Sequence, residues 1–226
     1  MIEIKLIAFD YDRVLTDENL NFDGEIVKYI MDMKNNGIIT GIITGRRWAY
    51  IEKMKNLFDF IVYENGFFLY YNSHIKLFDE KQEKLARDAK NYLISNGLDC
   101  IFGDLLISCT MDKYDQLLEI KNTFKDIEIV SNIDRYLLLP KGIDKGNSLK
   151  KVLRMLDINE KNVAVVGDGE NDVSMFQLAG LPICIGNSID QLKKISKMCS
   201  NKKYSDGTKE ILEKLKNSNY KYNENI

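Results

Sequence analysis

The sequence predicts an α/β fold in which a parallel sheet, built from both ends of the chain, carries a smaller inserted α+β unit. Short apolar runs alternate with segments of helical periodicity over residues 1–66 and again over 144–226, which is typical of a parallel sheet covered on both faces. Between them, residues 67–143 combine two helical patterns with short strand candidates, a mixture typical of antiparallel pairing. We call this expected insert the cap. With 226 residues, 45% of them hydrophobic, the chain is long enough for such a two-part core.

The elements of the first part follow from periodicity and stop signals. Apolar and β-branched runs predict strands, and apolar residues at helical spacing predict helices, the first of which ends at Gly37. The expected strands are 2–9, 38–44 (IITGIIT) and 60–63 (FIVY), with helices over 25–36 and 46–58.

In the cap, two helices over 79–95 and 112–124 are each followed by short strand candidates, CIFGDLLISC, IEIVS and RYLLLP.

The alternation of strands and helices returns after the cap. The second part of the core is expected to contain strands 163–167 and 182–186 and helices over 146–156, 170–179, 188–196 and 207–217. The tripeptide ENG at 64–66 marks the start of the cap, and KGI at 141–143 marks the return.

Polar residues stand where several expected strands end. Asp10 and Asp12 follow the first strand, Thr44, Gly45 and Arg46 follow the second, and the run GDGEND (167–172) follows a later one. Lys145 begins the returning core helix. Because ligands of parallel sheets collect beyond the carboxyl ends of the strands, we expect these residues to share one edge.

Four aspartates at one edge repel one another unless a cation lies among them. Asp10, Asp12, Asp168 and Asp172 offer hard oxygen ligands, and the chain has one histidine and no CxxC pair. Mg²⁺ therefore fits this set better than zinc, and it keeps places in its shell for waters and phosphate oxygens.

These segments resemble the four motifs of the haloacid dehalogenase (HAD) superfamily of phosphatases, in the branch with a cap between the second and third motifs. DYDRVLTD is similar to the first motif, IITGRR to the second, KGIDKG to the third and GDGENDVSMF to the fourth, and ENGFFL resembles the start of the cap. The resemblance covers most of the chain. It implies a Rossmann-like HAD core with a C2-type cap, similar to Cof-like proteins and to archaeal-type phosphoglycolate phosphatases.

The resemblance also implies a role for each residue. Asp10 is expected to be the nucleophile that forms an aspartyl-phosphate, and Asp12 the general acid and then general base. Mg²⁺ is expected on Asp10, the Asp12 carbonyl, Asp168 and Asp172. The residues expected to bind the phosphoryl oxygens are Thr44, Gly45, Arg46, Lys145 and Asn171. Asn171 could instead steady Lys145.

Each motif also has a structural interpretation without chemistry. Asp10 and Asp12 suit an ordinary turn after a strand, GDGENDV suits a capped helix start with acids near the positive end of the helix dipole, and the stretch from Thr44 to Arg46 suits a strand end. Lys145 is less easily explained, because a cation at a helix N-terminus is unfavourable. The four motifs in order favour the phosphatase.

Arg13 departs from the family, which usually has glycine after the second aspartate. Two explanations stay open: an exposed arginine on a reshaped loop, or an arginine that contacts an anionic part of the substrate beyond its phosphate. Trp48 is expected to pack in the core or against the cap, and His74 to be an exposed structural residue.

Charge and hydropathy limit which binding partners and which cellular location we expect for the protein. The net charge of −2 gives no positive field for nucleic acid or an anionic membrane, no apolar run approaches the ~18 residues of a membrane span, and MIEIKLIAF lacks the features of a secretory signal. We expect a cytoplasmic protein whose four cysteines are reduced core residues. We make no prediction of its oligomeric state.

The expected function is Mg²⁺-dependent hydrolysis of a small phosphate monoester, either phosphoglycolate or a sugar phosphate. Two alternatives stay open. One is phosphotransfer of the phosphohexomutase type, because a sugar hydroxyl can replace water as acceptor. The other is a non-catalytic module that binds a phosphate ligand or receives phosphate as a signal.

Overall fold

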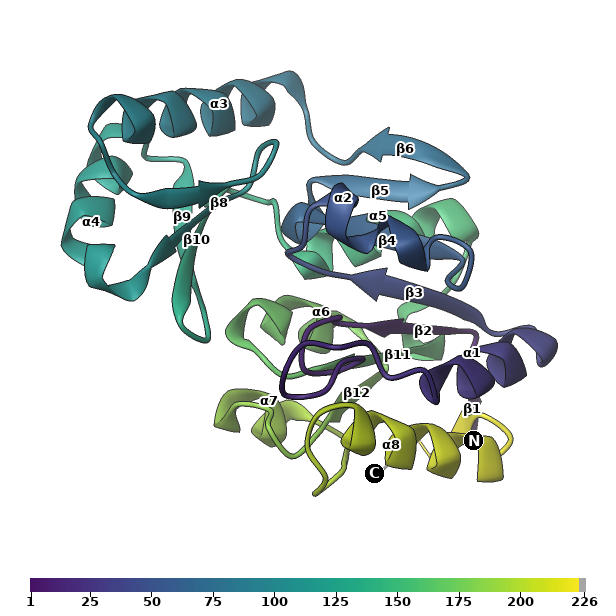
Figure 1. The fold of residues 1–226 in the computed structure, drawn as a ribbon. Coiled ribbons are helices and arrows are strands. Elements are labelled where there is room, and N and C mark those ends of the chain that lie inside the picture. The colour runs from purple at the N-terminus through teal and green to yellow at the C-terminus, as the bar shows by residue number, and fades with distance from the viewer. Residues whose placement is uncertain (224–226) are drawn as a thin grey trace.

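The large sheet of the protein has eight strands and is mostly parallel (Figure 1). The computed structural model describes residues 1–223. The sheet order is β13-β12-β11-β2-β3-β4-β5-β6. Only the pairs β4–β5 and β5–β6 of this described sheet are antiparallel. The strands are β2 (Leu6–Phe9), β3 (Ile39–Ile43), β4 (Phe60–Tyr63), β5 (Phe68–Tyr71), β6 (Ser73–Lys76), β11 (Val163–Gly167), β12 (Leu181–Cys184) and β13 (Met198–Cys199). The predicted α/β class with a Rossmann-like core is confirmed.

Helices cover both faces of this sheet because its strands are apolar on both sides. Along β2, Ile7 and Phe9 belong to one buried cluster, whereas Leu6 and Ala8 belong to the other, as the alternation of strand side chains requires. The first face packs against α1 (Ile26–Asn35), α2 (Trp48–Ile51) and α8 (Tyr204–Asn217), and the second against α5 (Lys145–Leu156), α6 (Val173–Leu178) and α7 (Asp190–Ile195).

Residues 80–140 form a small unit beside the large sheet (Figure 1). Its antiparallel sheet has the order β7-β8-β10-β9, and Leu138 packs with the helices while Leu137 and Leu139 face a second cluster that includes Phe67. The elements are α3 (Glu80–Ser95), β7 (Cys100–Phe102), β8 (Ile107–Thr110), α4 (Tyr114–Thr123), β9 (Ile127–Asn132) and β10 (Arg135–Pro140).

The structure differs from the expected elements at three places. Residues 68–76, expected within the cap, form a hairpin that extends the large sheet beyond β4. The helix expected over 46–58 is α-helical only at Trp48–Ile51 and continues as a 3-10 turn at Glu52–Met54. Aromatic residues favour a helix less than most residues do, and Trp48 packs on Tyr70, with 4.7 Å between the ring centroids. The strand expected over 2–9 is interrupted at Ile4 and Lys5.

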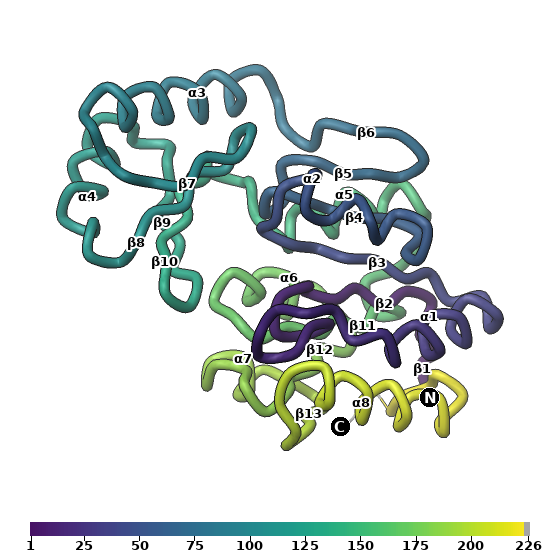
Figure 2. The backbone as a smooth tube through the Cα atoms, in the orientation of Figure 1, coloured from purple at the N-terminus to yellow at the C-terminus, as the bar shows by residue number. Residues whose placement is uncertain are grey.

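That split brings the two ends of the described chain together. β1 (Ile2–Glu3) leaves the large sheet and pairs with β14 (Lys221–Tyr222), so that the first and last segments run side by side (Figure 2). Both ends of the chain therefore contribute to the larger unit.

The expectation of reduced cysteines is wrong in this structure. Cys100 is bonded to Cys109, and Cys184 to Cys199. Each pair lies directly opposite on neighbouring strands, β7 with β8 and β12 with β13, at Cα separations of 4.4 and 4.5 Å, which is within disulfide reach. Pairing across strands is a register effect that cysteine spacing along the chain does not reveal.

Candidate active site

The predicted site residues converge at the carboxyl ends of the parallel strands. β2 lies between β3 and β11 in the sheet, so the residues that follow these three strands are brought to one edge. The Asp10 N–H extends the ladder by donating to the Val166 carbonyl at 2.9 Å, and the Thr44 N–H donates to the Val62 carbonyl at 2.9 Å.

Lys145 joins two of the aspartates from the start of α5. Its ammonium nitrogen lies 2.6 Å from Asp10 Oδ1 and 2.6 Å from Asp172 Oδ1. The lysine is fully buried, and the two carboxylates are almost so. Burial lowers the pKa of Lys145, but the facing carboxylates outweigh it and raise that pKa above its ordinary value. The lysine is therefore charged although it is shielded from solvent.

One lysine does not neutralise this group of acids. Asp10, Asp168 and Asp172 place one carboxylate oxygen each within 4.8 Å of the others. Burial raises the pKa of Asp10 to about 7 despite Lys145, with the nearby Asp172 and Asp12 adding to the increase. Burial, then the charges of Asp10 and Asp172, raise the pKa of Asp168 to about 8. Asp10 and Asp168 can therefore both be fully ionised near neutral pH only if a further cation offsets the repulsion between the acids.

Both carboxylate oxygens of Asp172 accept hydrogen bonds from other residues of the site. Oδ1 accepts from Lys145, and Oδ2 accepts from the backbone N–H groups of Asp168 and Gly169 at 2.8 and 3.0 Å. A side chain added at Gly167 would meet Asp172 at 2.6 Å. The GDGEND turn is thus folded around the carboxylate of Asp172, which in turn orients Asp168 toward Asp10.

Asp12 lies in an ion pair that sequence reasoning missed. The Arg46 guanidinium donates from Nε to Asp12 Oδ2 at 2.8 Å and from Nη2 to Oδ1 at 2.9 Å, a fork that suits a carboxylate. Arg46 also lies over the ring of Tyr50, at 4.3 Å from its centroid. The structure thus brings Arg46 to the site, where its guanidinium group pairs with Asp12.

The remaining predicted residues surround this centre. Thr44 is fully buried, and its hydroxyl accepts from the Arg46 N–H at 3.1 Å. Asn171 donates from Nδ2 to Asn65 Oδ1 at 2.9 Å. Gly45 and Asn171 both line the cleft described below.

Asn187 is a further site residue that the sequence reading missed. Its Nδ2 donates to Asp168 Oδ2 at 2.8 Å and to the Arg13 carbonyl at 3.2 Å, while its Oδ1 accepts from the Tyr204 N–H at 2.7 Å. It follows the end of β12, so the same strand-end rule could have found it in the run CIGNS.

A cleft of about 490 Å³ opens over the acids. One wall comes from the large unit and includes Asp10, Asp12, Arg13 and Asp168. The opposite wall comes from the small unit, through Ile101, Gly103, Leu106, Ser108 and residues 132–135 and 137. Trp48 and His74 do not line it; His74 is exposed and shares a 2.9 Å hydrogen bond with the Tyr63 hydroxyl.

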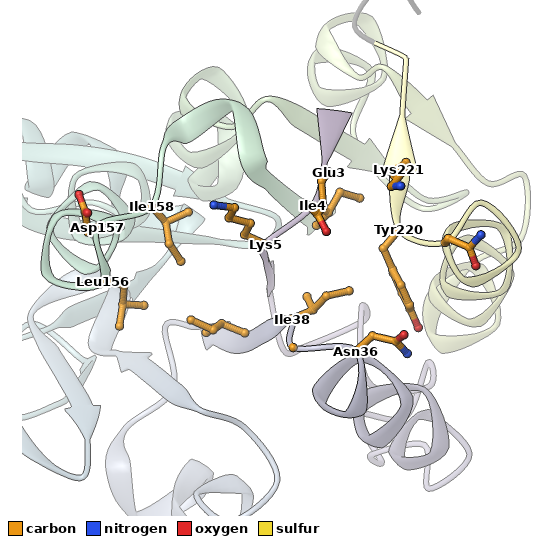
Figure 3. A pocket seen from close by; sticks show the side chains of 13 residues that line it. Glu3, Ile4, Lys5, Asn36, Ile38, Leu156, Asp157, Ile158, Tyr220 and Lys221 are labelled. Atoms are coloured by element: carbon orange, nitrogen blue, oxygen red, sulfur yellow. The ribbon is translucent and has the colours of Figure 1, made fainter. Parts of the chain in front are cut away.

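Another cavity, of about 500 Å³, lies at the opposite end of the sheet. Figure 3 shows its lining, which includes Lys5, Ile38 and Ile158. Lys5 and Ile38 directly precede β2 and β3, so this cavity is at the amino ends of the strands. It contains none of the clustered acids, and the cleft at the carboxyl ends is therefore the candidate active site.

Comparisons with known proteins agree with this geometry. A family model described as haloacid dehalogenase-like hydrolase matches residues 55–212. Phosphoglycolate phosphatase 2 of Saccharolobus solfataricus is 30% identical over 226 residues, covering 95% of this chain and 94% of its own. The phosphoglycolate phosphatase of Sulfurisphaera tokodaii is 28% identical over 219 residues, covering 94% of both chains.

Solved structures share the whole fold. A Thermoplasma acidophilum protein superposes with a TM-score of 0.80 at 21% identity, covering 95% of this chain and 99% of its own. A sugar phosphatase of HAD subclass IIB superposes with a TM-score of 0.75 at 17% identity, covering 96% of this chain and all of its own.

The chain belongs to the haloacid dehalogenase-like hydrolase family. Within that family it is a phosphatase similar to the archaeal phosphoglycolate phosphatases. Among residues 1–223, no helix combines the length and the apolarity that crossing a membrane requires.

Proposed function

We propose that this phosphatase hydrolyses a small phosphate monoester through an aspartyl-phosphate on Asp10. The observation that carries the proposal is the buried contact of Lys145 with Asp10 and Asp172, with Asp168 in the same group, beneath an open cleft. A buried lysine and three acids at the strand ends are costly for stability, which favours a functional explanation.

The first step is assigned to Asp10 Oδ2. This oxygen accepts no hydrogen bond from residues 1–223, whereas Oδ1 is held by Lys145. Attack by Oδ2 forms an oxygen–phosphorus bond as the ester oxygen leaves, and Asp12 gives that oxygen a proton. In the second step water attacks the phosphorus, returns a proton to Asp12 and releases Asp10 and phosphate.

The donor set fits Mg²⁺. Three buried carboxylates offer hard oxygen ligands in excess of the nearby positive charge, and no histidine or thiol competes for the site. We assign the ion to Asp10 and Asp168, with the Asp12 carbonyl and Asp172 completing the set directly or through water. When bound, Mg²⁺ supplies positive charge that reduces repulsion between the nucleophile and the phosphate dianion.

The phosphoryl oxygens are assigned to donors on the rim of the acid group. Lys145 carries the positive charge, and Thr44, Gly45 and Asn171 supply a hydroxyl, a backbone N–H and an amide. Arg46 is given a second role, because its contact with Asp12 orients the acid–base group. The predicted site of Asp10, Asp12, Thr44, Gly45, Arg46, Lys145, Asp168, Asn171 and Asp172 is thus retained as a proposal.

We also propose that the small unit acts as the cap. The cleft needs both units for its walls, so the small unit restricts which esters reach Asp10. Because β5 and β6 pair with the large sheet, we place the start of the insert after β6 and not at residue 67. The substrate is proposed to be a small soluble ester, phosphoglycolate or a sugar phosphate.

Phosphate release from a panel of esters with and without Mg²⁺ tests this function, with Asp10→Asn as the matched variant. The amide is not a nucleophile, so turnover should fall by at least ~10³-fold while the thermal melt stays close to that of the parent. Substantial turnover by Asp10→Asn would contradict the proposal. Omission of any acceptor alcohol separates hydrolysis from phosphotransfer, because a transferase releases little phosphate without one.

A further inference from the structure

Arg13 occupies a backbone conformation that favours glycine. Its φ is 58°, in the left-handed region where a side chain is disfavoured. Two explanations stand for this arginine: an exposed residue on a reshaped loop, or a residue that contacts an anionic part of the substrate beyond its phosphate.

The backbone of Arg13 gives no reason for a side chain at this position. Its N–H donates to Thr16 Oγ1 at 2.7 Å, and its carbonyl accepts from Asn187 Nδ2 at 3.2 Å. These contacts involve only main-chain atoms of residue 13, so glycine would make them equally well and without strain. What the arginine adds is its guanidinium group.

That guanidinium group is available to a ligand. Arg13 is partly buried and lines the cleft with Asp10 and Asp168. Within residues 1–223 its side chain makes no hydrogen bond and no ion pair. The other three arginines of the cleft each donate to a fixed partner: Arg46 to Asp12, Arg47 to the Phe102 carbonyl and Arg135 to Ser108.

We propose that Arg13 determines specificity by binding a carboxylate on the substrate, separate from the phosphate. A guanidinium group offers paired donors that match a carboxylate, and Arg13 lines the same cleft as Asp10, so a small ester bound at Asp10 occupies the cleft that Arg13 lines. This inference rests on the proposed function, which it deepens: the preferred substrates are small phosphate esters that also carry a carboxylate.

Two esters of similar size test this role. Phosphoglycolate carries the carboxylate, and 2-hydroxyethyl phosphate replaces it by a neutral alcohol. Wild type should prefer phosphoglycolate. In Arg13→Gly and Arg13→Gln, kcat/KM for phosphoglycolate should fall by about 10- to 100-fold, mainly through KM, because a charge-assisted hydrogen bond is lost. The value for 2-hydroxyethyl phosphate should change by less than about threefold.

Two variants serve as controls. Arg13→Lys should recover part of the preference, because it keeps the charge without the fork. Arg154→Gln removes a positive charge from an exposed position in the last turn of α5, outside the cleft, and should leave both esters unaffected. Arg13→Gly should melt within a few degrees of wild type, because glycine accepts φ 58° without strain.

Equal losses for both esters, no loss for either, or no preference in wild type would overturn the role of Arg13. If neither ester is hydrolysed with Mg²⁺ present, the proposed function fails instead. Calorimetric affinities of the two esters for wild type and Arg13→Gly then still decide the question: a selective loss for phosphoglycolate supports the role, and unchanged affinities overturn it.

Discussion

Lys145 Nζ lies 2.6 Å from Asp10 Oδ1, in a contact between two side chains that are at most one-tenth exposed. Removing one partner of such a pair leaves the other charge buried and uncompensated. In Lys145→Met, Asp10 and Asp172 remain buried without a cation. We therefore expect the free energy of unfolding at pH 8, without Mg²⁺, to fall by about 3–5 kcal/mol, measured by urea denaturation.

Lys209 provides the matched control for that loss. It also contacts carboxylates, those of Asp23, Glu25 and Asp206, but the last two are largely exposed. Solvent weakens such pairs, so Lys209→Met should cost less than about 1 kcal/mol per exposed pair. Similar losses for the two lysines would show that the Lys145 contact is no more than a surface ion pair.

Asp12→Asn should affect substrates according to their leaving group. Asp12 is proposed to protonate the leaving oxygen, which matters greatly for an alkoxide and little for p-nitrophenolate. We expect the first step to slow by ~10²–10⁴-fold with an alkyl phosphate and far less with p-nitrophenyl phosphate, in single-turnover measurements. Asn19→Ala, on the same loop but exposed, is the control. Equal slowing for both esters would argue against acid catalysis by Asp12.

Mg²⁺ should stabilise the protein more at high pH than at low pH. The pKa values of Asp10 and Asp168 rise from the ordinary 3.8 to about 7 and about 8. Between about pH 4 and pH 8 the folded, metal-free protein therefore holds protons that the unfolded chain has released, so its stability decreases as pH rises through this window. Mg²⁺ binds the deprotonated acids and offsets that loss.

The increase in melting temperature on adding Mg²⁺ should accordingly be larger at pH 8.5 than at pH 6. Sodium chloride at equal ionic strength controls for screening, and Asp168→Asn should reduce the pH dependence. The same increase at both pH values would contradict a metal bound by acids with raised pKa.

Glu64 should be essential for the loop that forms part of the cleft wall. Its fully buried carboxylate accepts from the N–H groups of Asp104, Leu105 and Leu106 at 2.7, 2.9 and 2.9 Å. Glu64→Ala leaves buried donors unsatisfied, each costing about 1–3 kcal/mol, and should speed hydrogen exchange at Leu105 and Leu106. Glu64→Gln keeps one acceptor oxygen and should have a smaller effect. Unchanged exchange in Glu64→Ala would exclude this role.

Much of the candidate site could be predicted because it depends on local patterns. Asp10, Thr44 and Asp168 each follow an apolar strand, and the carboxyl ends of parallel strands meet at one edge. Their meeting needs no knowledge of side-chain rotamers. Lys145 could be added because a cation at a helix start is unfavourable without nearby acids.

The missed features depend on tertiary contacts between distant segments. The Arg46 contact with Asp12 joins residues 34 positions apart, and the Glu64 contact with Leu105 joins residues 41 apart. Residues 68–76 were included in the cap because the sequence along the chain does not show that β5 pairs with β4. The spacing of residues along the chain predicts neither these two contacts nor the pairing of the hairpin.

Asp10 is proposed to receive the phosphoryl group from the substrate. Asp12→Asn, given p-nitrophenyl phosphate and Mg²⁺, should accumulate the phosphoenzyme, because this ester needs little acid catalysis while the second step lacks its base. Borohydride reduces an acyl phosphate, and peptide mass spectrometry then locates the modified residue. We predict reduction at Asp10, dependent on both ester and Mg²⁺. Reduction at another carboxylate, or none during continued turnover, would show that Asp10 is not the nucleophile.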